Sequence, residues 1–562
     1  MQFQKTPDFL IVLEPCYTRR LAEEIACIGN FPVTLAFMRS SSENRSTYFP
    51  EFTLPYSAAA PSMSVVKNLP KPTAVPIDVR SPKKQAGLGL WMQTVLQECD
   101  RAGVDFAPDP VHDLRVALRR CRSVADSFML VDPNPAWKQM KKAGRQVFRS
   151  LGDLRDVQVM KEWLLQLFDG NDHVAVSLAQ TLSERESRLK LEAAKALPEF
   201  DRKQWLKWSS TLPRLVEKIR KGSAVFRNLA LERYEDAHRL HQVALRNRSK
   251  VAFHNLRIGL KRFRYTVENC LPEQHEAWKA DLKEMQDLLG EVHDLDVLWT
   301  SVLQAKVFAD PEARTRWRAR IAEERIRRIN RYREKMLGKA ALWQVWRSAL
   351  PQGDQIEESA QARLKIWASA LDPQFAHSLR VCRIALLLYD SFPSKQTESD
   401  SARQRAILQA ASLLHNVGLS KTERKHHKAS YRLILRIRAY PGYDAQFLRM
   451  SAGVARYHRG ALPRTGHAGV RQFSAIERQQ VARLAGILRL ASALDTAHNG
   501  EFPSLEIAER GSLIVISVTG YSPFSKGAES IAAARHLLES VSGRPIIIKS
   551  AAASKSASAP ES

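Results

Sequence analysis

Hydrophobic residues recur at spacings of three and four along most of the chain, from residue 85 to 350 and again from about 370 to 494. Residues at these spacings share one face of an α-helix, so both stretches predict amphipathic helices that pack on a core. Near the C-terminus, short apolar runs predict strands at 504–508, 512–518 and 545–548, with a helix before the last one. We therefore expect a mainly α fold with a small α+β extension at its C-terminal end.

The two ends of the chain show other patterns. Residues 1–80 contain two short apolar runs around a helical stretch, followed by a segment rich in Pro and Ser that is typical of a linker. Residues 551–562 are rich in Ala and Ser, which predicts a disordered tail. Between them we expect a duplicated helical domain at 81–350 and a second helical domain at 365–550. The role of the N-terminal segment stays open.

The first helical domain contains an internal repeat. The segment HDLRVALRRCR at 112–122 matches HNLRIGLKRFR at 254–264, which lies 142 positions later. Two further matches follow in the same order at an offset of 138: LGDLRD at 151–156 with LGEVHD at 289–294, and one Trp-x-x-Trp pair with another. Ordered matches at a nearly constant offset indicate a tandem duplication of one helical unit.

Each repeat carries a basic stripe. At about 100° per residue, positions 112, 115, 119 and 122 fall within roughly 80° of one another on a helix. The leucines at 114 and 118 lie on the other side, where we expect the core. Arginine offers forked donors to paired phosphate oxygens, and lysine offers a compact charge. A histidine among these cations loses its proton easily and regains it when a polyanion binds. We expect the stripe to face solvent.

Two other interpretations of the stripe remain. In the first, its arginines form structural ion pairs with the acids of the second repeated motif, Asp153, Asp156, Glu291 and Asp294. In the second, the ligand is nucleic acid. Stacking on bases requires aromatic residues among the basic ones, and these occur only at Phe263 and Tyr265. The tryptophan pairs are more typical of core packing.

The repeated motif resembles the CHAD (conserved histidine α-helical) domain over about residues 81–350. The resemblance implies two four-helix bundles related by pseudo-symmetry, and binding of inorganic polyphosphate on the basic surface. By position, the residues that this resemblance implies as polyphosphate ligands are His112, Arg115, Arg119, Arg120 and Arg122 in the first repeat, with His254, Arg257, Lys261, Arg262 and Arg264 in the second.

The second helical domain contains histidines in an ordered set. In HD phosphohydrolases a divalent ion is held by a His, then a His-Asp pair, then an Asp, in this order along the chain. The ion activates a water molecule. Segments such as LLHNVG at 413–418 and LRLASALD at 488–495 make the region 365–550 similar to the C-terminal HD-like domain of the exopolyphosphatase and guanosine-pentaphosphate phosphohydrolase family. By position, that resemblance places His377, His415, Asn416 and Asp495 at the metal-ligand positions.

The motif departs from the family at one ligand. Asn416 stands where the family has Asp, and a neutral amide supplies no anionic coordination, so we expect a vestigial metal site. Nearby basic residues serve phosphate equally well without a metal, and we predict a secondary phosphate-binding surface from His426, His427, Lys428, His458 and Arg459.

Charge and composition agree with a polyanion ligand without selecting one. The chain has 562 residues, with 86 Lys and Arg against 59 Asp and Glu, a formal net charge of +27 and a pI near 10.0. Such an excess attracts nucleic acid, anionic membranes and polyphosphate alike. The six cysteines form no Cys-x-x-Cys pair, and no run of about 18 apolar residues or signal peptide is evident. We expect a cytoplasmic protein that does not insert into membranes.

These observations lead to three hypotheses. The first is a polyphosphate-binding protein, associated with polyphosphate granules and without a cofactor, in which the degenerate HD-like domain adds phosphate binding. The second is a metal-dependent phosphohydrolase that acts on polyphosphate or a phosphorylated nucleotide with Mg²⁺ or Mn²⁺. The third is a nucleic-acid-binding protein. We favour binding over catalysis.

Overall fold

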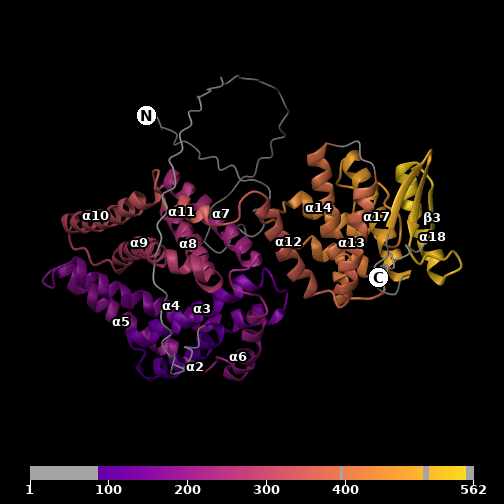
Figure 1. Ribbon diagram of the computed structural model, residues 1–562. Helices are drawn as coiled ribbons and strands as arrows, with labels where there is room; N and C mark the ends of the chain where they lie inside the picture. The colour runs from indigo at the N-terminus through magenta and orange to yellow at the C-terminus, as the bar shows by residue number, and fades with distance from the viewer. Residues whose placement is uncertain (1–86, 393–396, 498–504, 552–562) are drawn as a thin grey trace, which may run out of the picture. The chain divides into compact units, whose positions relative to one another are not determined.

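The computed structural model describes residues 87–392, 397–497 and 505–551 (Figure 1). The fold is mainly α with a small sheet near the C-terminus, which confirms the expected fold class. The predictions for residues 1–80, for the tail after 551 and for residue 504 of the first strand lie outside the described residues. Within the described residues, no helix is both long enough and apolar enough to cross a membrane.

Two successive sets of helices form the duplicated part of the chain (Figure 1). They are α2 (Leu88–Asp105), α3 (Pro108–Phe128), α4 (Pro135–Leu167), α5 (His173–Ala196) and α6 (Arg202–Glu217), followed by α7 (Ala224–Asn247), α8 (Lys250–Cys270), α9 (Pro272–Ala305), α10 (Pro311–Met336) and α11 (Leu342–Ser348). The first repeated motif lies on α3 and its copy lies on α8. Helix α3 packs on α8, and α4 packs on α9, so equivalent helices of the two sets meet.

The leucines of the repeat lie in the core, as their spacing predicts. Leu114 and Leu256 have no exposed surface, and Leu118 is 4% exposed. The tryptophan pairs are buried too, on α6 and α11. Since these rings are inside, they offer no face on which a nucleic-acid base can stack.

Local signals set the helix boundaries. Side chains of Asn134, Asp172, Asp201, Ser249 and Asp310 each accept a hydrogen bond from a backbone N–H in the first turn of the helix that follows. Such caps satisfy donors that have no partner within the helix, and each contributes about 1 kcal/mol.

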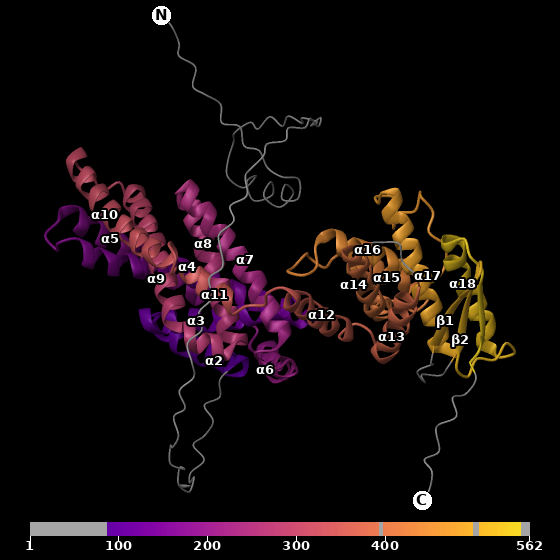
Figure 2. The same ribbon diagram turned by 45° about the horizontal axis from the view of Figure 1, so that its top comes forward.

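A second core begins with α12 (Asp354–Ser369). It continues through α13 (Phe375–Ser391), α14 (Glu398–Leu414), the 3₁₀ turn η1 (Val417–Ser420), α15 (His426–Ile434), α16 (Ala445–Arg456) and α17 (Ala475–Ala497). The chain ends in β1 (Leu505–Arg510), β2 (Leu513–Val518), α18 (Lys526–Ser542) and β3 (Ile546–Ser550). Strand β2 pairs antiparallel with β1 and parallel with β3. Helix α18 packs on α17 (Figure 2).

Residues 87–351 expressed alone are expected to fold as one cooperative helical unit, because a single hydrophobic core runs from Leu88 to Leu350. Circular dichroism should show a helical spectrum and one thermal transition. A matched fragment that ends at residue 337 lacks Trp343 and Trp346, and it should lose the sharp transition. An unfolded or strand-rich longer fragment would contradict the architecture.

Candidate functional site

The packing of α3 on α8 brings the two basic stripes together. Arg115 and Arg119 of α3 and Arg257 and Lys261 of α8 are half-buried, and we call these four residues the central basic cluster. Burial, followed by the positive charges of Arg257 and Arg119, lowers the pKa of Lys261 to about 6. Burial likewise lowers the pKa of Arg115 to about 10, with Arg119 acting in the same direction. Cations of both repeats therefore share one electrostatic environment.

Two carboxylates lie beside this cluster, one from each repeat. Burial raises the pKa of Asp294 to about 6, against the opposing charge of Arg257. Burial also raises the pKa of Asp156, against the charge of Arg115. Neither acid forms an ion pair within 4.0 Å with any of the four cations. The alternative interpretation, in which the stripe forms ion pairs with the repeated acids, therefore does not hold for Asp156 and Asp294, and the four basic residues of the cluster outnumber these two acids.

Two guanidinium groups of the cluster keep unused donors. The Nε atoms of Arg115 and Arg257 are buried without a hydrogen-bond partner. Arg115 donates from Nη1 to the carbonyl oxygen of Phe148 at 2.9 Å, and its guanidinium lies 4.6 Å from the centre of the Phe148 ring. A buried donor without a partner costs about 1–3 kcal/mol. Arg115 is thus held in place by Phe148, while both guanidinium groups keep a donor that no protein group satisfies.

The other cations of the stripe have individual surroundings. Arg120 forms an ion pair with Glu268 of α8 and lies 4.8 Å from the Trp91 ring. Arg122 pairs with Asp126 at 3.9 Å. Arg120 and Arg122 thus form ion pairs, but with acids other than the four that the ion-pair interpretation named. Of the ten predicted residues, those exposed are His112, Arg122 and Arg262, while the other seven are half-buried, so the expectation that the whole stripe faces solvent is corrected.

The two repeat histidines lie at the edge of the cluster. Burial lowers the pKa of His254, followed by the charges of Arg257 and Lys261. Its ring centre is 5.0 Å from that of His293 on α9. Burial lowers the pKa of His112, and Arg155 adds to the effect. Both imidazoles are thus kept neutral by their surroundings until a negative charge arrives.

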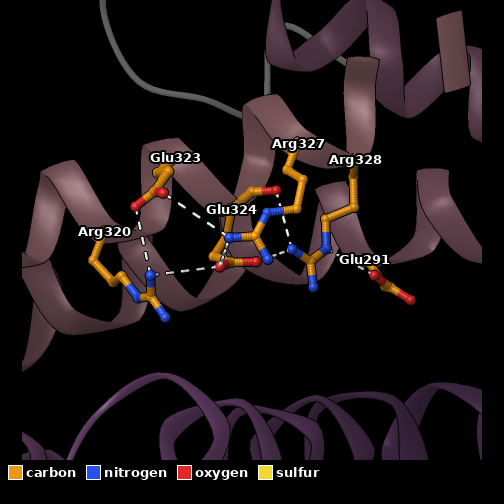
Figure 3. Close-up of polar contacts among 6 residues, drawn as sticks. All are labelled: Glu291, Arg320, Glu323, Glu324, Arg327 and Arg328. Carbon is orange, nitrogen blue, oxygen red and sulfur yellow. Dashed lines mark hydrogen bonds and ion pairs between the residues drawn. The ribbon is translucent and has the colours of Figure 1, made fainter. Parts of the chain in front are cut away.

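Glu291 has a partner that the sequence pattern did not indicate. It accepts a hydrogen bond from Nε of Arg328 on α10 at 2.8 Å (Figure 3). Arg328 also pairs with Glu324, which is 3% exposed and which receives Arg327 at 2.9 Å. The acid of the second motif therefore stabilises α10 and is not available to neutralise the central basic cluster.

In the second helical part, the expected metal ligands form a different contact. Asp495 is 1% exposed, and its carboxylate lies 2.5 Å from Nδ1 of His377. The same carboxylate accepts hydrogen bonds from Nε and Nη2 of Arg380 at 2.8 and 3.2 Å. Asn416 is buried and neutral. Because a guanidinium holds the single carboxylate of the set, His377, His415, Asn416 and Asp495 do not fit a divalent ion.

Arg380 is a residue that our sequence analysis missed. It lies on α13, three positions after His377, and so on the same helix face. The presence of Arg380 close to the ligand position His377 is the sequence signal that could have indicated a neutralised Asp495.

Four histidines gather near the end of α14. The ring centres of His415 and His458 are 4.8 Å apart, and those of His426 and His458 are 5.3 Å apart. Burial lowers the pKa of His415 to about 3 and that of His458 well below its usual value. Burial and then Arg456 lower the pKa of His427 to about 4, with Lys428 and Arg459 acting in the same direction. The predicted secondary phosphate residues therefore lie together.

Two family models match the chain. Residues 93–303 match the CHAD domain, and residues 367–511 match domain III of the Ppx/GppA phosphatases. A solved structure that matches is the CHAD domain from the plant Ricinus communis, at 21% sequence identity and a TM-score of 0.35, over 47% of this chain and 90% of that chain. A search of curated proteins finds no match.

Replacing Asp495 with Asn should lower the free energy of unfolding by about 1–3 kcal/mol, because a buried carboxylate that accepts hydrogen bonds from Arg380 and lies against His377 is lost. Urea denaturation followed by circular dichroism measures the change. Asp390→Asn is the matched control, since Asp390 pairs with Arg405 at a surface where both side chains are more than 40% exposed. That control should cost less than about 1 kcal/mol. Equal effects of the two variants would contradict the buried role of Asp495.

Proposed function

Because the chain carries a CHAD domain followed by a Ppx/GppA-type domain III, we propose that it binds inorganic polyphosphate. Both domains indicate a polyphosphate-related function. The observation that carries the proposal is the central basic cluster, in which Arg115, Arg119, Arg257 and Lys261 come from two repeats and make no ion pair within 4.0 Å among the described residues. A long chain of phosphates supplies the missing negative charge along both helices at once.

The surroundings of the cluster favour polyphosphate over nucleic acid. Phe263 has no exposed surface, and Trp205, Trp208, Trp343 and Trp346 are buried, so they give bases no stacking platform. Tyr265 is half-buried beside Arg264 and Arg120. A polyanion without bases needs only charge and hydrogen-bond donors, and the cluster offers both.

The Ppx/GppA-type domain contributes phosphate binding rather than hydrolysis in this proposal. Asp495, the one carboxylate among its expected metal ligands, is held by Arg380. Of the residues predicted for a second phosphate-binding surface, His426 and His458 are buried, which corrects that prediction for these two. Lys428 and Arg459 are exposed and His427 is half-buried, and these three supply the second surface in this proposal. Divalent-metal hydrolysis with Mg²⁺ or Mn²⁺ is the alternative, and release of phosphate from polyphosphate would favour it.

Neutralising the central basic cluster should weaken polyphosphate binding strongly. We expect the double variant Arg119→Gln, Lys261→Gln to lower affinity at least tenfold and to flatten the dependence of log Kd on log salt concentration. By analogy with nucleic acids, each lost phosphate contact changes that slope by about 0.7–0.9. Neutral replacements are preferable to charge reversal because both side chains are half-buried. Calorimetric titration with long-chain polyphosphate at several salt concentrations measures both quantities.

The matched control is Arg424→Gln, Lys425→Gln, which removes two exposed cations near the secondary surface. It should change affinity less than threefold. Unaltered affinity and salt slope in the cluster variant, with its helical spectrum intact, would contradict the proposal. Equal competition by single-stranded DNA would instead support the nucleic-acid hypothesis.

Binding should strengthen as pH falls from 8 to 6. In the free protein Lys261 gains its proton only near pH 6, and a bound polyanion raises that pKa. Proton uptake therefore accompanies binding above pH 6, and affinity rises by up to about tenfold per pH unit for each proton taken up. Protonation of Asp294, whose pKa is also about 6, acts in the same direction.

Lys261→Arg keeps the positive charge throughout this range, so its pH profile should be shallower and its affinity at pH 8 higher. Titrations in buffers of different ionisation enthalpy count the protons. Identical proton uptake in the variant and the unmodified protein would show that Lys261 is not the group that titrates.

A further inference from the structure

Three histidines reach one buried place from separate segments of the Ppx/GppA-type domain. His415 follows α14, His426 begins α15 and His458 follows α16, with 1%, 6% and 7% of their surfaces exposed. Gly418 makes this arrangement possible, because a Cβ there would lie 2.1 Å from the carbonyl oxygen of His426. Ser430 then ties the segments together by donating to the carbonyl oxygen of His415 at 2.7 Å.

The backbone fixes the tautomer of all three rings. Each Nδ1 lies within hydrogen-bond distance of the carbonyl oxygen three residues earlier in the chain, at 2.7 Å for His415, 3.1 Å for His426 and 2.7 Å for His458. A carbonyl oxygen only accepts, so each Nδ1 carries the proton, and each neutral ring keeps a lone pair on Nε2. A histidine that donates from its other nitrogen to a backbone carbonyl is oriented as metal-binding histidines are.

The Nε2 atoms of His426 and His458 face each other at 3.2 Å. Two lone pairs at this distance repel unless a cation lies between them. Zinc binds imidazole at about 2.0–2.1 Å in a tetrahedron, which puts neighbouring nitrogens about 3.3 Å apart and ring centres about 5.2 Å apart. Two of the three ring-centre separations, 5.3 Å between His426 and His458 and 4.8 Å between His415 and His458, agree with this geometry.

A shared proton is the competing explanation for the short contact. A shared proton would join His426 to His458. It would leave the buried Nε2 of His415 without a hydrogen-bond partner. A metal ion satisfies all three nitrogens. Among the described residues, no group of three or more possible ligands is already arranged as a metal site, so the ring of His415 has to close on the other two when the ion binds.

We propose that His415, His426 and His458 bind one transition-metal ion of the Zn²⁺ class through Nε2. This site retains His415, which belongs to the expected HD ligand set. In place of Asn416 and Asp495 it uses the imidazoles of His426 and His458. Imidazole ligands suit zinc, copper and nickel, whereas Mg²⁺ and Mn²⁺ prefer oxygen. The ion expected from the sequence motif is therefore replaced by a softer one. The proposal does not depend on anion binding by the central basic cluster.

The test uses the full chain, stripped with a chelator and then titrated with Zn²⁺ by calorimetry. We expect one equivalent to bind, and elemental analysis after dialysis to retain it, while Mg²⁺ gives no heat. Co²⁺ in place of Zn²⁺ should give the visible absorption of tetrahedral nitrogen coordination. His426→Gln and His458→Gln should each weaken Zn²⁺ binding by at least tenfold. Loss of a residue that only hydrogen-bonds to a metal ligand already lowers affinity by about 10–100-fold.

Two controls separate this site from other binding. His536→Gln removes an exposed histidine of α18 and should leave Zn²⁺ affinity unchanged. Asn416→Asp should also leave it unchanged, whereas it would raise affinity if the HD set were the ligands. Absence of Zn²⁺ binding by the unmodified protein, or full binding by the folded His426→Gln variant, would overturn the proposal. If His458→Gln fails to fold, the proposal is tested by the Co²⁺ spectrum of the unmodified protein and by the Zn²⁺ affinity of His426→Gln.

Discussion

Contact between α3 and α8 is the constraint on which the candidate binding site depends. The contact includes the ion pair between Arg120 and Glu268, and it brings cations of two repeats into one half-buried cluster. Buried like charges are costly, and the protein offsets only part of that cost with two acids. Loss of charge at Lys261, whose pKa falls to about 6, reduces the remaining repulsion between the cations. A fold that tolerates this repulsion without a ligand is already arranged to receive negative charge.

The same electrostatic reasoning leads to the opposite result in the Ppx/GppA-type domain. There Asp495 is buried, and its charge is already matched by Arg380. A carboxylate in this state has little left to offer a metal ion, whereas neutral imidazoles nearby keep their lone pairs. The chemistry of the two domains therefore differs in which charges remain unmatched, and not in how many charged residues each contains.

Local patterns predicted a large share of this structure. The spacing of Leu114 and Leu118 indicated the buried face of α3, and the repeat at 254–264 predicted a second helix of the same kind, because helical periodicity is a property of neighbouring residues. Partners distant in sequence were not predictable in this way. The pairing of Arg120 with Glu268 depends on how the two repeats pack, and that packing has no local signature.

The histidines show the same limit from another side. The sequence assigned His415 to the metal-ligand set and His458 to the secondary phosphate surface, but it did not indicate which nitrogen of each ring is free. That property follows from carbonyl oxygens three residues earlier, which become acceptors only where a helix ends.

Duplication has one more consequence for the ligand. Equivalent helices meet pairwise, α3 with α8 and α4 with α9, so the cluster contains equivalent groups of both repeats. Nucleic acids have a chemical polarity, and reversing the strand changes every contact. An unbranched chain of phosphates reads the same from either end. In the proposed function, such a polymer would bind the paired helices in either orientation with nearly the same contacts, an advantage that a directional polymer does not have.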